Sequence, residues 1–272
     1  MKFFCKKEYK FRLNFTRHSK LDYDVNMELN YEEKGTGPAV ILIHGWGGSH
    51  ASLENLATEL ANNGFRTINV DLPGSGSSEP PATPMFMNDY VELLICLIKR
   101  LELVRPVMVG HSFGGKIGMF LAVKYQTVLS RLVLIDASGI KPIKTLKNKI
   151  TYIIAKIANI ILWIPPLFLF RPIFRFLYYK LIVREYDYLK SGQMKATFKN
   201  VINQHIDENL GKIKNDTLII WGRDDRYTPL RDGEKIAQGI KNSRLEVVDG
   251  VGHSLPLVGP QIVAKLIINF LN

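Results

Sequence analysis

The chain of 272 residues is poor in cysteine and lacks the apolar leader of a secreted protein. Its two cysteines, Cys5 and Cys96, cannot form a disulfide framework. Cys96 falls within an apolar helical pattern, so we expect it to be a small core residue. The N-terminal residues are charged and have no continuous apolar segment of the kind that a secretion signal requires. These absences predict a reducing, cytoplasmic location.

Acidic residues are missing from one long stretch and rare in another. Residues 141–184 contain no Asp or Glu, and Glu8 is the single acid among residues 1–20, although the whole chain carries a net charge of +11. Basic blocks of this kind could attract anionic partners, and a solvated surface accounts for them equally well. No nucleic-acid-binding motif accompanies the basic residues, so nucleic acid is not an expected partner.

Neither a membrane-spanning helix nor a nucleotide site is predicted. Lys156, Asn159 and the Pro165-Pro166 pair interrupt every apolar run of about twenty residues within 150–183, which excludes a spanning helix. The glycine-rich loops have no lysine at the offset that phosphate binding requires. No group of metal ligands with a recognisable spacing is present either. We therefore expect no metal and no cofactor.

Strand and helix patterns alternate along most of the chain, whose composition (46% hydrophobic, 22% charged) is that of a globular protein. The alternation stops after Gly139 and returns at Thr217. It implies an α/β fold with a mostly parallel sheet and helices on both faces, and ligands of such sheets bind at the carboxyl ends of the strands. The predicted strands are 25–33, 39–43, 66–70, 107–109, 131–135, 217–221 and 244–248.

The sequence Gly110-His-Ser112-Phe-Gly114 joins a buried strand to an amphipathic helix. A turn this sharp crowds the backbone, and glycines on both sides of the serine remove the Cβ atoms that would collide. The hydroxyl of Ser112 is thereby expected to stand at the end of the sheet, beside the N-terminus of the new helix. Amide groups at that position stabilise an anion, so Ser112 is a candidate nucleophile.

A serine nucleophile needs a base to accept its proton and an acid to orient that base. Among six histidines, His253 follows a predicted strand in a Gly-Val-Gly-His loop, so its ring could reach the serine. Asp225 also lies just beyond a strand end. The neighbouring Asp224 and the earlier Asp136 occupy comparable positions, and the residues alone leave the choice among the three carboxylates open.

The chain order Ser112, Asp225, His253 resembles that of the α/β-hydrolase superfamily. The Trp-Gly-Arg-Asp-Asp-Arg-Tyr-Thr-Pro stretch at 221–229 is similar to the acid loop of that superfamily, whose spacing selects Asp225 over Asp224. His-Gly-Trp-Gly-Gly at 44–48 is similar to its oxyanion loop. This resemblance implies that the backbone N–H groups of Trp46 and Phe113 hold the oxyanion.

The resemblance also implies an architecture. It covers roughly residues 25–272 except the lid, where such proteins vary freely. The expected fold is a mostly parallel, eight-stranded-type sheet with helices on both faces. Residues 25–139 and 214–272 would form this core, residues 140–213 a helical lid, and residues 1–24 an N-terminal extension.

The implied activity is acyl transfer to water from a small or medium apolar ester. Carbon–carbon bond cleavage or a lyase step, which the same superfamily performs with similar residues, is an alternative. A non-catalytic ligand receptor that keeps the fold is another. The apolar, acid-free stretch 141–184 is interpreted as a lid over the site, or as a lid that also contacts the membrane surface. The sequence does not predict the oligomeric state or the substrate-binding residues.

Overall fold

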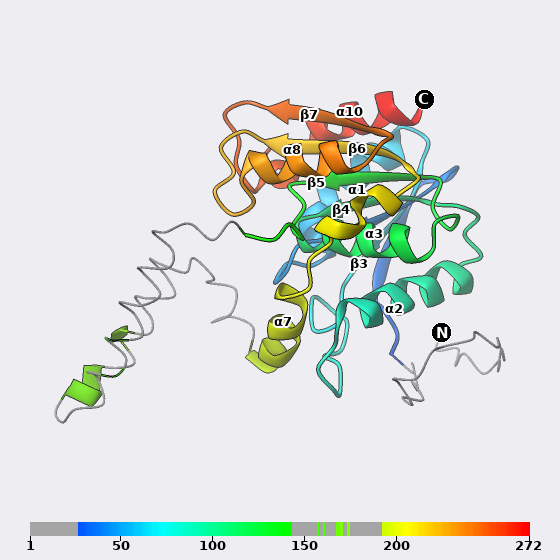
Figure 1. Ribbon diagram of the computed structural model, residues 1–272. Coiled ribbons are helices and arrows are strands. Elements are labelled where there is room, and N and C mark those ends of the chain that lie inside the picture. Colours follow the sequence, from blue (N-terminus) through cyan, green and yellow to red (C-terminus); the bar gives the residue numbers. More distant parts are fainter. Residues whose placement is uncertain (1–26, 143–156, 158–159, 161–166, 171–172, 175–191) are drawn as a thin grey trace.

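Seven strands form one twisted sheet in the computed structural model, which describes residues 27–142, 157, 160, 167–170, 173–174 and 192–272 (Figure 1). Their order across the sheet is β1-β3-β2-β4-β5-β6-β7. β1 pairs antiparallel with β3, and every other pair is parallel. The strands are β1 (Tyr31–Lys34), β2 (Ala39–Ile43), β3 (Arg66–Val70), β4 (Val107–His111), β5 (Arg131–Ile135), β6 (Asp216–Gly222) and β7 (Ser243–Val248).

Helices cover both faces of this sheet, as Figure 1 shows. The α-helices are α1 (Glu54–Asn62), α2 (Met87–Arg100), α3 (Phe113–Lys124), α7 (Lys195–Ile202), α8 (Leu230–Gly239), α9 (Leu255–Val258) and α10 (Pro260–Leu271). The short 3-10 helices are η1 (His50–Leu53), η2 (Leu167–Phe170), η4 (Gly192–Met194) and η5 (Asp207–Lys212). The α/β-hydrolase type of architecture expected from the sequence is thus confirmed.

Alternating strand residues build two separate cores, one on each face. In β2, Ile41 and Ile43 belong to the core that includes residues of α2, α3 and α8, whereas Val40 and Leu42 belong to the core that includes residues of α1 and α10. Successive side chains of a strand point to opposite faces, so a strand covered on both sides is apolar along most of its length. This explains why the mainly apolar sequences at 39–43 and 131–135 predict their strands with the observed bounds. The strand predicted at 66–70 also has the observed bounds, although it contains the buried polar residues Thr67 and Asn69.

Each of the seven strands predicted from the sequence has a counterpart in this sheet. Two expectations need correction. The strand predicted at 25–33 begins at Tyr31, because the amide of Asn30 donates to the hydroxyl of Ser78 at 2.8 Å instead of to a neighbouring strand. Cys96 is exposed rather than part of the core, since it lies on the outer face of α2, one residue before the buried Leu97.

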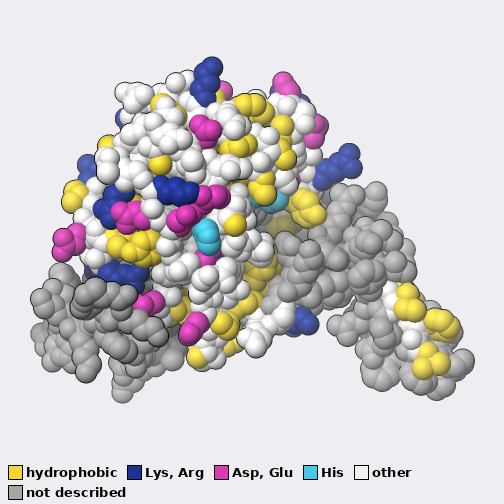
Figure 2. Space-filling view, turned by 180° about the vertical axis from the view of Figure 1, so that it is seen from behind, with side chains coloured by type: hydrophobic (Ala, Val, Ile, Leu, Met, Phe, Trp, Pro, Cys, Tyr) yellow, Lys and Arg dark blue, Asp and Glu magenta, His cyan; other side chains and the backbone are white. Residues whose placement is uncertain are grey.

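Most of the predicted lid (140–213), the N-terminal extension (1–24) and the stretch 141–184 lie outside the described residues. Membrane contact through 141–184 therefore stays a prediction. Its described and exposed residues include the basic Lys141 as well as apolar residues, whose side chains are yellow in Figure 2: Ile157, Ile160, Leu169, Phe170 and Ile173. Among the described residues, none of the helices has the length and apolarity that crossing a membrane would need.

Candidate active site

The turn between β4 and α3 holds Ser112 in a strained backbone conformation, with φ of 51° and ψ of −111°. Such a conformation costs of order 1–3 kcal/mol and persists only where the surrounding structure enforces it. A Cβ atom on Gly114 would lie 2.2 Å from the carbonyl oxygen of Ile43, and one on Gly110 would lie 2.5 Å from the backbone of Gly114. The predicted role of both glycines follows from these distances.

Three loops from the same edge of the sheet bring a hydroxyl, an imidazole and a carboxylate together. His253 Nε2 lies 3.0 Å from Ser112 Oγ, and His253 Nδ1 lies 2.7 Å from Asp225 Oδ2. With a proton on Nδ1, the imidazole donates to the carboxylate and its Nε2 accepts from the hydroxyl. The three residues follow β4, β6 and β7, so each is positioned by the carboxyl end of a buried strand.

Asp225 is buried and surrounded by donors. Its Oδ1 accepts hydrogen bonds from the amides of Tyr227 at 2.7 Å and Thr228 at 3.0 Å, and its Oδ2 accepts one from the Thr228 hydroxyl at 2.7 Å. Burial raises the pKa of the Asp225 carboxyl, but the hydrogen bonds from His253 and Thr228 outweigh burial and leave that pKa below its usual value. Asp224 is exposed, so the structure brings Asp225 and not Asp224 to the imidazole.

Asp136, the third carboxylate considered, is buried beside this group but does not take its place. Its Oδ1 accepts a hydrogen bond from the amide of Gly222 at 2.8 Å, whereas its buried Oδ2 has no hydrogen-bond partner among the described residues. Burial raises the pKa of Asp136 to about 7. The oxygen that contacts Nδ1 of His253 belongs to Asp225.

Two supporting residues escaped the sequence analysis. His111 is buried, and its Nε2 donates a hydrogen bond of 2.8 Å to the backbone carbonyl of His253. Burial, with the nearby His253, lowers the pKa of His111 to about 3, so its ring is neutral. Thr228 is the second, because its hydroxyl oxygen lies 2.7 Å from Asp225 Oδ2 and 3.1 Å from the backbone oxygen of Asp136. The position of His111 directly before the serine was the available signal for the first.

A possible metal-ligand group overlaps this arrangement. Ligand atoms of His111, Asp136 and His253 lie within 4.8 Å of one another. However, His253 uses both ring nitrogens for Asp225 and Ser112, and His111 uses Nε2 for the His253 carbonyl. The imidazole atoms of the group are thus committed to the hydrogen-bonded chain, and we assign no metal to it.

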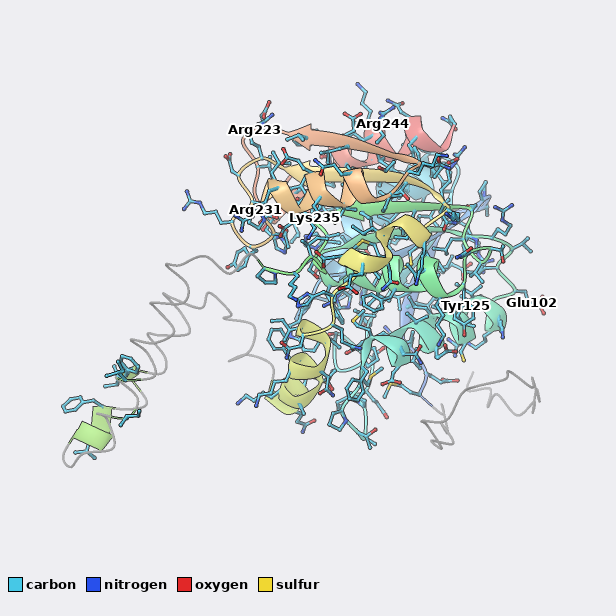
Figure 3. All side chains as sticks on the ribbon, in the orientation of Figure 1. Glu102, Tyr125, Arg223, Arg231, Lys235 and Arg244 are labelled. Carbon is cyan, nitrogen blue, oxygen red and sulfur yellow. The ribbon has the colours of Figure 1, made fainter. Side chains whose placement is uncertain are left out.

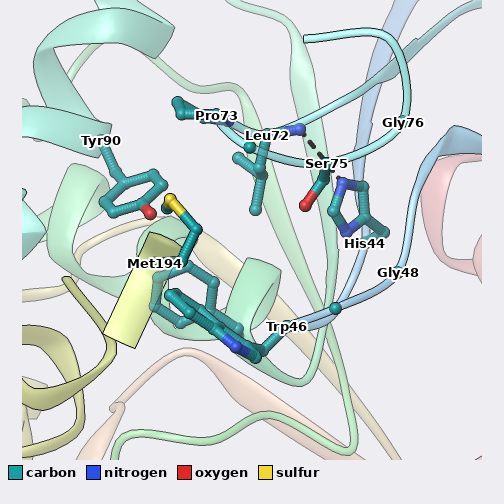
Figure 4. Close-up of a pocket in the computed structure, with 12 residues that line it drawn as sticks. His44, Trp46, Gly48, Leu72, Pro73, Ser75, Gly76, Tyr90 and Met194 are labelled. Carbon is teal, nitrogen blue, oxygen red and sulfur yellow. Dashed lines mark hydrogen bonds between the residues drawn. The ribbon is translucent and has the colours of Figure 1, made fainter. Parts of the chain in front are cut away.

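A pocket of about 330 Å³ lies beside Phe113, the residue that follows the serine (Figure 4). Trp46 and Phe113, the two residues expected to form the oxyanion hole, both line it. Their rings pack edge to face with centroids 5.2 Å apart, and the Trp46 ring packs in the same way on Phe198 at 5.0 Å. The described residues around the pocket come from the loops at 44–48 and 72–76, with Tyr90, Phe113 and Met194.

The loop that begins at Asp71 is held together by the side chain of that residue. The Asp71 carboxylate accepts hydrogen bonds from the amides of His50 at 2.7 Å and Ser77 at 2.9 Å and from the Asn30 side chain at 2.9 Å. A Cβ atom on Gly76 would lie 2.2 Å from this carboxylate, so the turn requires glycine there. Asp71 therefore fixes one wall of the pocket.

The sequence profile of the alpha/beta hydrolase fold family matches residues 38–153 and 177–260. The chain belongs to this family. Relatives of this α/β hydrolase include a 2-hydroxy-6-oxononadienedioate/2-hydroxy-6-oxononatrienedioate hydrolase of Pseudomonas putida, which is 26% identical and covers 92% of this chain and 94% of its own. The 2-hydroxy-6-oxo-6-phenylhexa-2,4-dienoate hydrolase of Comamonas testosteroni is 28% identical, with 83% and 84% covered.

Similar solved structures support the fold. A hydrolase from Pseudomonas aeruginosa PA01 superimposes with a TM-score of 0.70 at 24% identity, covering 93% of this chain and 97% of its own. An esterase from Thermogutta terrifontis superimposes with a TM-score of 0.69 at 23% identity, covering 90% and 93%. Together with the curated relatives, the family match supports hydrolase activity for this α/β hydrolase without fixing the bond that it cleaves.

Proposed function

We propose that this α/β hydrolase is a serine hydrolase that cleaves the carboxylic ester of a small or medium apolar substrate. The observation that carries the proposal is the continuous hydrogen-bonded chain from Ser112 through His253 to Asp225. Free serine is a weak nucleophile, and a base at 3.0 Å from its oxygen is the arrangement that activates it.

The proposed reaction proceeds in two halves. Ser112 Oγ attacks the ester carbonyl while His253 Nε2 takes the hydroxyl proton, and the C–O bond to the alcohol breaks as His253 returns that proton to the leaving oxygen. A water then attacks the acyl–enzyme bond, again losing its proton to His253, and the acid is released from Ser112. Asp225 stabilises the imidazolium in both halves and holds its tautomer.

The negative charge on the carbonyl oxygen needs donors, which we assign to the backbone N–H groups of Trp46 and Phe113. Phe113 is the first residue of α3, where amides have no intrahelical acceptor and the helix dipole favours an anion. Trp46 follows Gly45, whose Cβ position would lie 3.2 Å from Ser112 Cβ, so the loop passes directly beside the nucleophile. Removing one such donor typically costs about 10²–10³ in kcat.

Carbon–carbon bond hydrolysis is a second candidate, favoured by the names of the curated relatives. The substrate in each name is an oxo acid without an ester or amide, so its hydrolysis must break a bond between two carbon atoms beside the ketone. The same serine and imidazole could perform this step. The leaving group would then be a carbon that has to gain a proton, which places a different demand on the residues around His253.

Fluorophosphonate labelling tests the nucleophile first. We expect rapid labelling that is lost in Ser112→Ala and retained in the matched control Ser130→Ala, since Ser130 lies just before β5, at the opposite edge of the sheet. Folded protein that takes up no label would contradict the proposal and would favour a ligand receptor.

Substrate comparison then separates the two hydrolytic reactions. We expect release of p-nitrophenol from p-nitrophenyl esters of short chain length, and no change in the absorbance of 2-hydroxy-6-oxo-6-phenylhexa-2,4-dienoate. If the dienoate is consumed with a kcat/KM far above that of every ester, carbon–carbon hydrolysis replaces ester hydrolysis as the proposed function.

A further inference from the structure

The pocket beside the serine carries no formal charge on the described residues that line it. No Lys, Arg, Asp or Glu is among them. His44 is the one titratable group of that lining near neutrality, and burial lowers the pKa of its imidazole. Its Nε2 accepts a hydrogen bond of 3.1 Å from the amide of Leu72, the dashed line in Figure 4, which requires a neutral ring with an unprotonated Nε2.

Tyr90 gives this uncharged pocket a hydrogen-bonding end. Its side chain is 1% exposed, and its ring packs edge to face on Phe113 with centroids 5.1 Å apart. Figure 4 shows the Tyr90 hydroxyl directed toward Met194, within the space that these residues enclose. Burial raises the pKa of Tyr90, so the hydroxyl stays protonated and can donate.

Packing around Met194 limits the pocket in this direction. A Cβ atom on Gly74 would lie 2.8 Å from Met194 Sδ, so that loop and the Met194 side chain are already in close contact. A volume of about 330 Å³ is at the lower end of the range for ligand pockets, which is about 300–1,000 Å³. A short chain fits this space better than a long one.

We propose that this pocket receives the acyl chain and that Tyr90 selects a short, uncharged chain bearing a hydrogen-bond acceptor toward its far end. The assignment of the chain to the acyl side rests on the proposed ester hydrolysis. Trp46 and Phe113, the two residues whose amides we assign to the oxyanion, both line the pocket, and Phe113 directly follows the nucleophile. The proposal therefore directs the chain attached to the reacting carbonyl toward the Tyr90 hydroxyl.

A carboxylate at the far end of the acyl chain fits this pocket poorly. An anion moved from water into this partly buried site loses its hydration without gaining a cationic partner among the described residues that line the pocket, which disfavours its binding. A ketone or ether oxygen has a much smaller desolvation cost and can accept the Tyr90 hydrogen bond. The structure thus favours neutral oxo-acyl chains over dicarboxylate chains such as the dienedioate in the name of the Pseudomonas putida relative.

Two esters of equal chain length test the role of Tyr90. We expect the ratio of kcat/KM for p-nitrophenyl 4-oxopentanoate to that for p-nitrophenyl pentanoate to fall by about 3–10-fold in Tyr90→Phe, the value of one neutral hydrogen bond. The matched control is Tyr125→Phe, which removes a hydroxyl that donates to Glu92 just beyond the far end of α3 (Figure 3) and should leave the ratio unchanged. A ratio equal in wild type and Tyr90→Phe overturns the proposal.

A charged ester supplies the second arm. The p-nitrophenyl monoester of succinic acid has a carboxylate where 4-oxopentanoate has its methyl ketone, and we expect its kcat/KM to be at least about tenfold lower, since each 1.4 kcal/mol of desolvation cost is tenfold. Faster hydrolysis of the succinate ester than of the oxo ester would overturn the proposal.

Binding measured without turnover separates this proposal from the ester hydrolysis on which it rests. Ser112→Ala should bind ethyl 4-oxopentanoate about 3–10-fold more tightly than ethyl pentanoate, and the added substitution Tyr90→Phe should remove the difference. This binding difference without any ester hydrolysis by wild type supports the pocket and refutes the proposed function. Hydrolysis of both esters with no dependence on Tyr90 supports the proposed function and refutes the proposed role of the pocket. Equal or undetectable binding of the two ethyl esters also counts against that role.

Discussion

The residues on the two sides of Ser112 differ in their chemistry. On one side, Asp225, His253 and Thr228 form a chain of charged and polar groups joined by hydrogen bonds of 2.7–3.2 Å. On the other side, the Phe113 ring packs edge to face with the rings of Trp46 and Tyr90, with centroids 5.1–5.2 Å apart. The polar side fixes directions and protonation, whereas the aromatic side fixes shape.

This difference separates the rate of the proposed reaction from its selectivity. Groups that move protons are used by every substrate, so their loss should lower all rates by one common factor. Groups that only contact the chain should change the ratio between substrates. Measuring two esters for each variant, pentanoate and 4-oxopentanoate, therefore shows to which side a residue belongs.

Ser112→Ala should have the largest effect. Without the hydroxyl there is no nucleophile, and we expect kcat/KM for both esters to fall by about 10⁴-fold or more. The substitution removes one oxygen atom of a half-buried side chain and should leave the thermal unfolding midpoint within a few degrees of wild type. Substantial residual hydrolysis by pure Ser112→Ala would mean that another group attacks the ester.

Asp225→Asn should have the next largest effect, about 10³–10⁴-fold on kcat/KM. An amide at this position can donate to His253 Nδ1 and would hold the imidazole in the tautomer that cannot accept the Ser112 proton. Both esters should lose the same factor. An unequal loss would show that the carboxylate also contacts the acyl chain, and the division between the two sides would then fail.

Sequence patterns predicted the polar side better than the aromatic one. Ser112 and His253 were selected because each follows a buried strand, and parallel strands deliver their carboxyl ends to one edge. Asp225 meets the same criterion, but its selection over Asp224 came from the resemblance to the α/β-hydrolase superfamily. The buried strands could also be predicted, because strands covered on both faces are mainly apolar. Tyr90 and Met194 carried no such signal, because a side chain that lines a pocket and one that fills a core have the same helical spacing.

Hydrogen bonds between residues far apart in the chain also could not be predicted from the sequence. The link from His111 to the carbonyl of His253 spans 142 positions along the chain. Cys96 shows the converse error: its neighbours in α2 are buried, but the helix turns this one side chain outward. The periodicity of apolar residues indicates that a helix has a buried face. A small residue at the border of that face can be buried or exposed.

His111→Phe should have a moderate effect of about tenfold on kcat for both esters. The ring volume is nearly retained, but the carbonyl of His253 loses its buried donor, a loss of roughly 1–3 kcal/mol in stability and positioning. His111→Gln is the matched control, since its amide nitrogen can reach the position of the imidazole Nε2. We expect kcat to recover partly in this variant. Equal activity of all three proteins would show that the histidine loop is held by other contacts.

Asp136→Asn should have the smallest effect on activity, within about threefold for both esters, and an effect on stability that depends on pH. The pKa of Asp136 is about 7 in the folded protein, against 3.8 for an unperturbed carboxyl. Between these values the folded state binds more protons than the unfolded state, so its free energy of unfolding falls as pH rises and levels off above about pH 7. Asparagine does not titrate, keeps the oxygen that accepts from Gly222, and tolerates the backbone φ of 45° at this position.

We therefore expect the free energy of unfolding of Asp136→Asn, relative to that of wild type, to increase from pH 4 to pH 8 in urea denaturation. At 1.36 kcal/mol per pKa unit, the increase is about 4 kcal/mol at most. A difference independent of pH would mean that Asp136 is already ionised at pH 4. The polar side would then hold two buried carboxylates, and the charge of the His253 imidazolium would be shared between them. A difference that rises as expected leaves Asp225 as the anion that faces His253 below about pH 7, so that one carboxylate orients the base while its neighbour remains neutral.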